Sequence, residues 1–82
     1  MSDADNDAVR NAVTDLLDYL RTNPHSADTF EGIQRWWLIG KPYPGSIIRT
    51  ALEYLVEQNK LCKQRRGGND YYFIAPDKQD NH

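Results

Sequence analysis

The chain of 82 residues has room for one domain, and a composition of 39% hydrophobic and 27% charged residues indicates a small globular fold that is neither disordered nor fibrous. Its longest uninterrupted apolar run without a tyrosine spans residues 36–39, far short of the roughly 18–20 residues that cross a bilayer, so we expect no membrane partner. Cys62 is the only cysteine and the two histidines are isolated, which argues against an internal disulfide, a metal site or a bound cofactor.

Charge is distributed unevenly along the chain. The net charge is −2, but residues 1–31 carry seven acids and two bases, a balance of −5, whereas residues 32–82 carry eight bases and five acids, a balance of +3. Charges further apart than about 8 Å are largely screened at physiological salt, so the acidic half need not keep a polyanion away from the basic half. Residues 1–7 also lack the cationic start and apolar stretch of a secretory signal, which predicts a cytoplasmic protein.

The N-terminal region predicts a tail and then a helix. Residues 1–6 are polar and are expected to be disordered, and Asn6 or Asp7 can cap a helix that runs to about Thr22. Pro24 ends it, because the residue before a proline is pushed out of helical conformation. Apolar residues recur at the spacing of one buried helical face, namely Val9, Ala12, Val13, Leu16, Leu17 and Leu20.

A capping box starts the second predicted helix. Asp28 and Glu31 have the required spacing, and the helix should span about 29–38 with Phe30, Ile33, Trp37 and Leu38 on one face. Residues 25–27 are too few to assign, although extended chain would fit there.

Two tryptophans stand next to each other in this helix. Adjacent helical positions point about 100° apart, so only one ring can face the core well. Trp37 is the core candidate. Trp36 is left either at the rim of the core or as an exposed aromatic anchor for a partner.

A stiff connection leads into the third predicted helix. Residues 40–45 contain two prolines and two glycines, and Tyr43 between the prolines is either a packing plug or a recognition element. Ser46 can cap a helix that runs to Gln58, with Asn59 as a left-handed C-cap. Its packing face would hold Ile47, Ile48, Ala51, Leu52, Tyr54 and Leu55, and its presented face Ser46, Arg49, Thr50, Glu53 and Glu57.

A β-hairpin should follow, with residues 60–66 and 71–74 flanking the turn 67–70. With Gly68 and Asn69 at the centre of the turn, the facing pairs would be Arg66 with Tyr71, Arg65 with Tyr72, Gln64 with Phe73 and Lys63 with Ile74. Leu61, Tyr72 and Ile74 would then share one side. A turn centred on Asn69 and Asp70 would move the turn by one residue and so change this register. The polar residues 76–82 are expected to form a disordered tail.

Three helices followed by a hairpin make residues 7–75 resemble the winged helix-turn-helix family. The most specific stretch is 51–61, where leucines precede an asparagine and a further leucine opens the hairpin; Gly67, Gly68 and Tyr72 also fit. The resemblance implies a small α+β winged-helix domain, a three-helix bundle with a C-terminal β-hairpin wing. It also implies that the third helix enters the DNA major groove while the wing lies along the backbone or minor groove.

The leading hypothesis is therefore a non-catalytic winged-helix protein, a transcription regulator or accessory factor, that binds double-stranded DNA mainly through phosphate contacts, with modest base reading by Arg49 and Thr50. The expected nucleic-acid-binding residues are Lys41, Ser46, Arg49, Thr50, Lys63, Arg65 and Arg66. Lysine and arginine also protect exposed strand edges from pairing, so a purely structural role for the basic hairpin stays open.

The alternative is a protein-interaction adaptor in a multiprotein assembly, docking through Trp36, Tyr43, Glu53 and Glu57. Two features favour it: the connection before the third helix is longer than in a tight helix-turn-helix, and Glu53 and Glu57 are awkward beside phosphate. No enzyme is expected, because Cys62 has no discernible base and the acids of the first helix lie on its solvated face.

Overall fold

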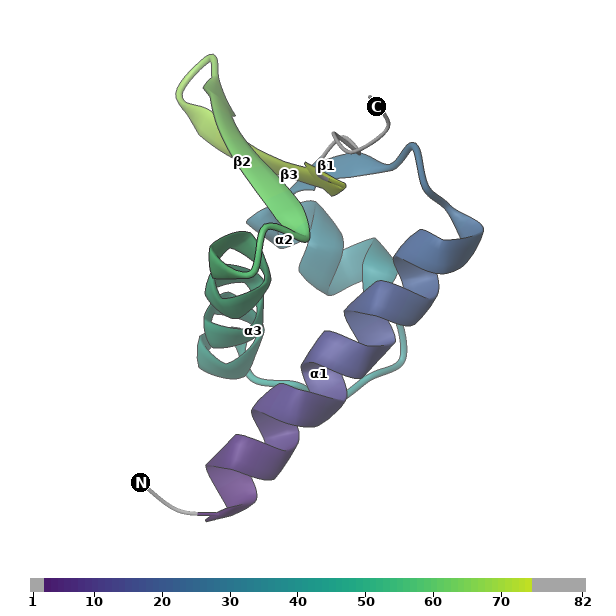
Figure 1. Ribbon diagram of the computed structural model, residues 1–82, viewed down its shortest axis with the longest axis vertical. Helices are drawn as coiled ribbons and strands as arrows, with labels where there is room; N and C mark the ends of the chain where they lie inside the picture. Colours follow the sequence, from purple (N-terminus) through teal and green to yellow (C-terminus); the bar gives the residue numbers. More distant parts are fainter. Residues whose placement is uncertain (1–2, 75–82) are drawn as a thin grey trace, which may run out of the picture.

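The structure, a computed structural model, describes residues 3–74, and the predicted C-terminal tail lies outside them. An α+β domain is formed in which helices pack at one end of a three-stranded antiparallel sheet of order β1–β3–β2 (Figure 1). The predicted α+β class is therefore confirmed. The elements are α1 Asp3–Thr22, β1 Ala27–Thr29, α2 Phe30–Gly32, the π-helical η1 Ile33–Trp37, α3 Gly45–Glu57, β2 Leu61–Arg66 and β3 Asn69–Ile74.

The core lies where the helices meet the base of the sheet. Trp37 is buried as predicted, and its ring stacks on Tyr19 with centroids 5.1 Å apart. Tyr54 was expected in the core but is 48% exposed, because it points about 100° away from the buried Leu55 and so lies at the margin of the apolar face. The buried residues are Ala12, Leu16, Leu20, Ile33, Trp37, Leu38, Ile48, Ala51, Leu52, Leu55, Leu61 and Tyr72.

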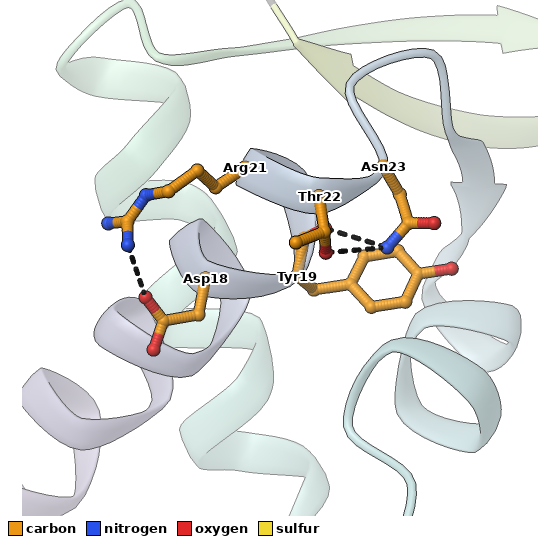
Figure 2. A network of polar contacts seen from close by, with 5 residues as sticks. All are labelled: Asp18, Tyr19, Arg21, Thr22 and Asn23. Atoms are coloured by element: carbon orange, nitrogen blue, oxygen red, sulfur yellow. Dashed lines mark hydrogen bonds and ion pairs between the residues drawn. The ribbon is translucent and has the colours of Figure 1, made fainter.

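The helix α1 begins at Asp3, earlier than the predicted start at residue 7. No proline or glycine interrupts the chain between these positions, so the helix extends through a segment that was expected to be a tail. At the other end, the side-chain amide of Asn23 donates to the Tyr19 carbonyl (2.9 Å) and to the Thr22 hydroxyl oxygen (3.0 Å), as Figure 2 shows. The backbone amide of Asn23 donates to the same Tyr19 carbonyl at 2.9 Å, so residue 23 closes the last turn of α1 with both its main chain and its side chain.

The second helix starts later and is wound differently than predicted. Residues 27–29 pair with 71–73 of β3, which keeps the chain extended through Thr29. Thr29, not Asp28, is therefore the N-cap, and its hydroxyl oxygen accepts from the Gly32 amide at 3.2 Å. The Asp28 carboxylate accepts from the Thr29 amide instead (2.8 Å), so the predicted capping box does not form. The carboxylate lies where a Cβ on residue 32 would be, so any other residue at that position would have to displace it.

The third helix also has a different cap from the one predicted. It begins at Gly45 with Pro44 as N-cap, and the Pro44 carbonyl accepts from the amides of residues 47 and 48, so Ser46 lies inside the first turn. The other end agrees with the prediction: Asn59 has φ of 61°, and the Lys60 amide donates to the Leu55 carbonyl at 2.9 Å. This is the bonding pattern of a left-handed C-cap.

The hairpin forms, but in a different register. Gly67 and Gly68 have φ of 57° and 87° and occupy the centre of the turn, because a primed turn needs positive φ at both central positions. Arg65 therefore faces Asp70, and Lys63 faces Tyr72. The shift from the predicted pairs is two residues, which preserves side-chain alternation. The prediction that Leu61, Tyr72 and Ile74 share the core-facing side is confirmed.

Within residues 3–74, no helix is both long enough and apolar enough to cross a membrane.

Replacing Asn59 by alanine should lower the free energy of unfolding by about 1 kcal/mol, because most side chains are strained by roughly 1–2 kcal/mol in the left-handed region. Glycine adopts this conformation without strain, so Asn59→Gly should equal or exceed the parent in stability. Urea denaturation of the three proteins measures the difference. Equal stability of the alanine and glycine variants would contradict the prediction.

Candidate nucleic-acid interface

A hollow lies between the start of α2, the first half of α3 and the tip of the hairpin. Phe30 and Glu31 line it from α2, Arg49 from α3, and Asn69 and Asp70 from the hairpin. The hairpin extends away from the helices and α3 lies next to its base (Figure 1). Segments that are 20 residues apart in the sequence thus border one concave surface.

Arg49 is held on the wall of this hollow by an aromatic contact. Its guanidinium carbon lies 4.6 Å from the centroid of the Phe30 ring, a cation–π distance. The edge of the same ring also approaches Gly45, one helical turn earlier on α3. Arg49 makes no ion pair with any residue that the structure describes, so the contact with Phe30 is the interaction recorded for its guanidinium there.

The three predicted cations of the hairpin are exposed but do not share one face. Lys63 and Arg65 lie on the side that carries Tyr72, whereas Arg66 lies on the opposite side and donates to the Gln64 side chain at 3.3 Å. Arg65 pairs with Asp70 at 3.4 Å. At the tip of a two-stranded ribbon, both sides are open to an extended ligand.

Ser46 and Thr50 are exposed on the first half of α3, as predicted. The Thr50 hydroxyl donates to the Ser46 carbonyl at 3.0 Å, which leaves its oxygen lone pairs free to accept. Glu53 and Glu57 are exposed on the second half of the same helix. Ser46 and Thr50 line a second hollow, between α1 and α3, and not the hollow that Arg49 lines, while the two acids follow further along the helix.

Lys41 does not belong with the other predicted cations. Its amine lies 3.8 Å from the Asp15 carboxylate on α1, and the Tyr43 hydroxyl donates to the same carboxylate at 2.6 Å. Burial, this hydrogen bond and the negative charge of Asp15 raise the pKa of Tyr43 to about 12. Tyr43 is half-buried against the core, so of its two interpretations the packing plug is the one that this geometry favours.

Two large apolar side chains are open to solvent near the end of the second helix. Trp36 is 58% exposed and Ile39 is 65% exposed. The sequence allowed two roles for Trp36, at the rim of the core or as an exposed anchor for a partner, and it gave no prediction for Ile39. Nothing in a single sequence marks Ile39, because its exposure depends on how the π-helical turn directs the residues after it.

Phe30 is the other residue whose role sequence reasoning missed. It was placed in the core from its spacing, and it does pack there in part. Its contact with Arg49 joins residues 19 positions apart, and no local pattern reports such a contact.

Within the described residues, no group of three or more histidine, cysteine or acidic side chains is arranged to hold a metal ion. Comparison of the chain with protein-family models, curated proteins and solved structures gave no significant match.

Replacing Tyr43 by phenylalanine should lower the free energy of unfolding by about 1 kcal/mol near neutral pH, because a hydrogen bond to a carboxylate is lost. The folded pKa is raised above the unfolded value, so this contribution is complete below about pH 10 and is lost as the pH rises through about 12. Denaturation of parent and variant from pH 7 to 12 measures it. If the difference in unfolding free energy between parent and variant grew above pH 10, the prediction would be wrong.

Proposed function

We propose that this chain is a winged-helix domain that binds double-stranded DNA without catalysing a reaction, with the first half of α3 directed at the major groove and the β2–β3 hairpin acting as the wing. The observation that carries the proposal is that Arg49 of α3 and the hairpin tip, through Gly68, Asn69 and Asp70, line one hollow, and the exposed Arg65 and Arg66 are the cross-strand partners of Asp70 and Asn69. A recognition helix and a basic hairpin beside it are what this mode of binding requires.

The placement of charge along α3 supports the same orientation. The first half offers the hydroxyls of Ser46 and Thr50, whereas Glu53 and Glu57 follow in the second half. Entry of the N-terminal half into the groove lets the carboxylates face away from phosphate. The positive end of the helix dipole then points toward DNA.

Affinity in this proposal comes mainly from the hairpin. Lys63, Arg65 and Arg66 are exposed and close together on the hairpin, whereas Lys41 lies beside Asp15 of α1 and not on the hairpin. Three phosphate contacts give a slope of log affinity against log salt of about −2.7. The acidic α1 does not prevent this binding, because charges beyond a Debye length of about 8 Å are screened.

A second candidate function is that of a protein-docking module, favoured by the exposure of Trp36 and Ile39. Aromatic side chains of this kind are enriched at the centres of protein interfaces. In this candidate Glu53 and Glu57 would meet a basic partner surface. The two functions differ in what the hairpin cations do, which a charge reversal tests.

Arg65→Glu combined with Arg66→Glu should abolish salt-sensitive binding to a labelled duplex of mixed sequence, measured by fluorescence anisotropy at two salt concentrations. The matched control is Arg21→Glu, because Arg21 pairs with Asp18 at 3.2 Å on α1 and is 75% exposed, much as Arg65 pairs with Asp70 and is 71% exposed. The control should keep the parent slope. No binding by the parent, or equal binding by the double variant, would favour the docking module.

Asp70→Asn should tighten binding to the same duplex by about two- to five-fold at low salt, since it frees Arg65 from an exposed ion pair worth roughly 0.2–1 kcal/mol and removes a charge that repels phosphate. Asp18→Asn, which breaks the pair with Arg21, is the control and should leave affinity near the parent value. Unchanged or weaker binding by Asp70→Asn would show that Arg65 does not reach DNA.

A further inference from the structure

The hollow beside α3 has a charge composition that a phosphate would not favour. Arg49 is the one cation among its described lining residues, and the same lining includes the acids Glu31 and Asp70. Each acid forms an ion pair, Glu31 with Arg35 at 3.9 Å and Asp70 with Arg65 at 3.4 Å. All four side chains are at least partly exposed, so these pairs are weak. A ligand group that enters here meets an arginine with carboxylates nearby.

A neutral acceptor suits this surface better than an anionic one. The carboxylates raise the energy of a phosphodiester placed between them much more than that of a base edge, because the acceptor atoms of a base carry only partial negative charge. In the major groove, the base edge that offers two adjacent acceptors is that of guanine, through O6 and N7. Arginine is the side chain that most often meets these two atoms together.

The Phe30 ring prepares Arg49 for such a contact. The ring lies beneath the guanidinium carbon, 4.6 Å away, and makes no hydrogen bond with it, so this contact uses none of the guanidinium N–H donors. It also restricts a side chain that would otherwise lose considerable rotamer freedom on binding. Phe30 itself is fixed at the first position of α2, next to the strand β1 that pairs with the wing.

We propose that Arg49, held in place by Phe30, reads a guanine in the DNA major groove, with Phe30 as a positioning residue. This inference rests on the proposed function, and it adds a sequence preference and a residue that sets it. It assigns base recognition to Arg49 and phosphate contact to the hairpin cations, which separates two properties that can be measured independently.

The test is selection from a pool of duplexes with a randomised centre, followed by sequencing, for the parent, Arg49→Gln, Phe30→Leu and Phe30→Tyr. The parent should enrich guanine at one or more positions by about five-fold or more, the discrimination of a bidentate contact. Arg49→Gln and Phe30→Leu should lose this enrichment and keep the parent salt slope. Phe30→Tyr should retain it, because tyrosine preserves the aromatic face.

A second measurement removes the acceptor from the DNA. Replacing the selected guanine by 7-deazaguanine should weaken binding by the parent about five-fold and leave binding by Arg49→Gln unchanged. This measurement does not depend on how well the Phe30 variants fold. Binding to the pool without guanine enrichment would overturn the inference and leave the proposed function intact. A salt slope that falls by about one unit in Arg49→Gln would also overturn it, because Arg49 would then contact phosphate. No binding to the pool at all would refute the proposed function itself.

Discussion

The pairing of β1 with β3 is the constraint on which the arrangement of this domain depends. Three residues, 27–29, join the first half of the chain to the end of the hairpin by an antiparallel ladder against 71–73. The ladder anchors a two-stranded ribbon that would be marginally stable alone. It also keeps the chain extended through Thr29, which sets the residue at which the second helix begins. The position of Phe30 next to α3 follows from this.

Buried contacts and exposed charges are separated along the hairpin. Leu61 at the base of the hairpin and Tyr72, which pairs with Lys63, are buried in the common core, whereas Arg65 and Arg66 lie further out and are exposed. The base of the hairpin therefore supplies the hydrophobic burial. Charged side chains on the outer part do not have to be buried in the core. Burial fixes the direction in which the outer part extends, and this places it beside α3.

Charge in this molecule is better described by pairs than by totals. Lys41 and Arg65 each lie within 4 Å of an aspartate, and such exposed pairs contribute little to stability. They still decide which cations are available to a ligand. Lys41 pairs with Asp15 of α1. Arg65 pairs with Asp70, which also lines the hollow beside Arg49. Arg49 differs from both, because it contacts an aromatic ring and pairs with no acid among residues 3–74.

The sequence by itself determined the elements that depend on neighbours in the chain. Apolar spacing located the buried faces of α1 and α3, Asn59 marked the left-handed end of α3, and the glycine-rich tetrad at 67–70 located the hairpin. Only the tertiary structure decided features that join distant segments: the start of the second helix, the exact pairing of the strands, the partner of each cation and the exposure of Trp36. The hairpin register depended on which residues took positive φ, and three candidate pairs in the tetrad satisfied the local rule. The contact of Phe30 with Arg49 was beyond sequence reasoning for a related reason: periodicity assigns a residue to a helical face, but which side chain of another helix covers that face is set by packing.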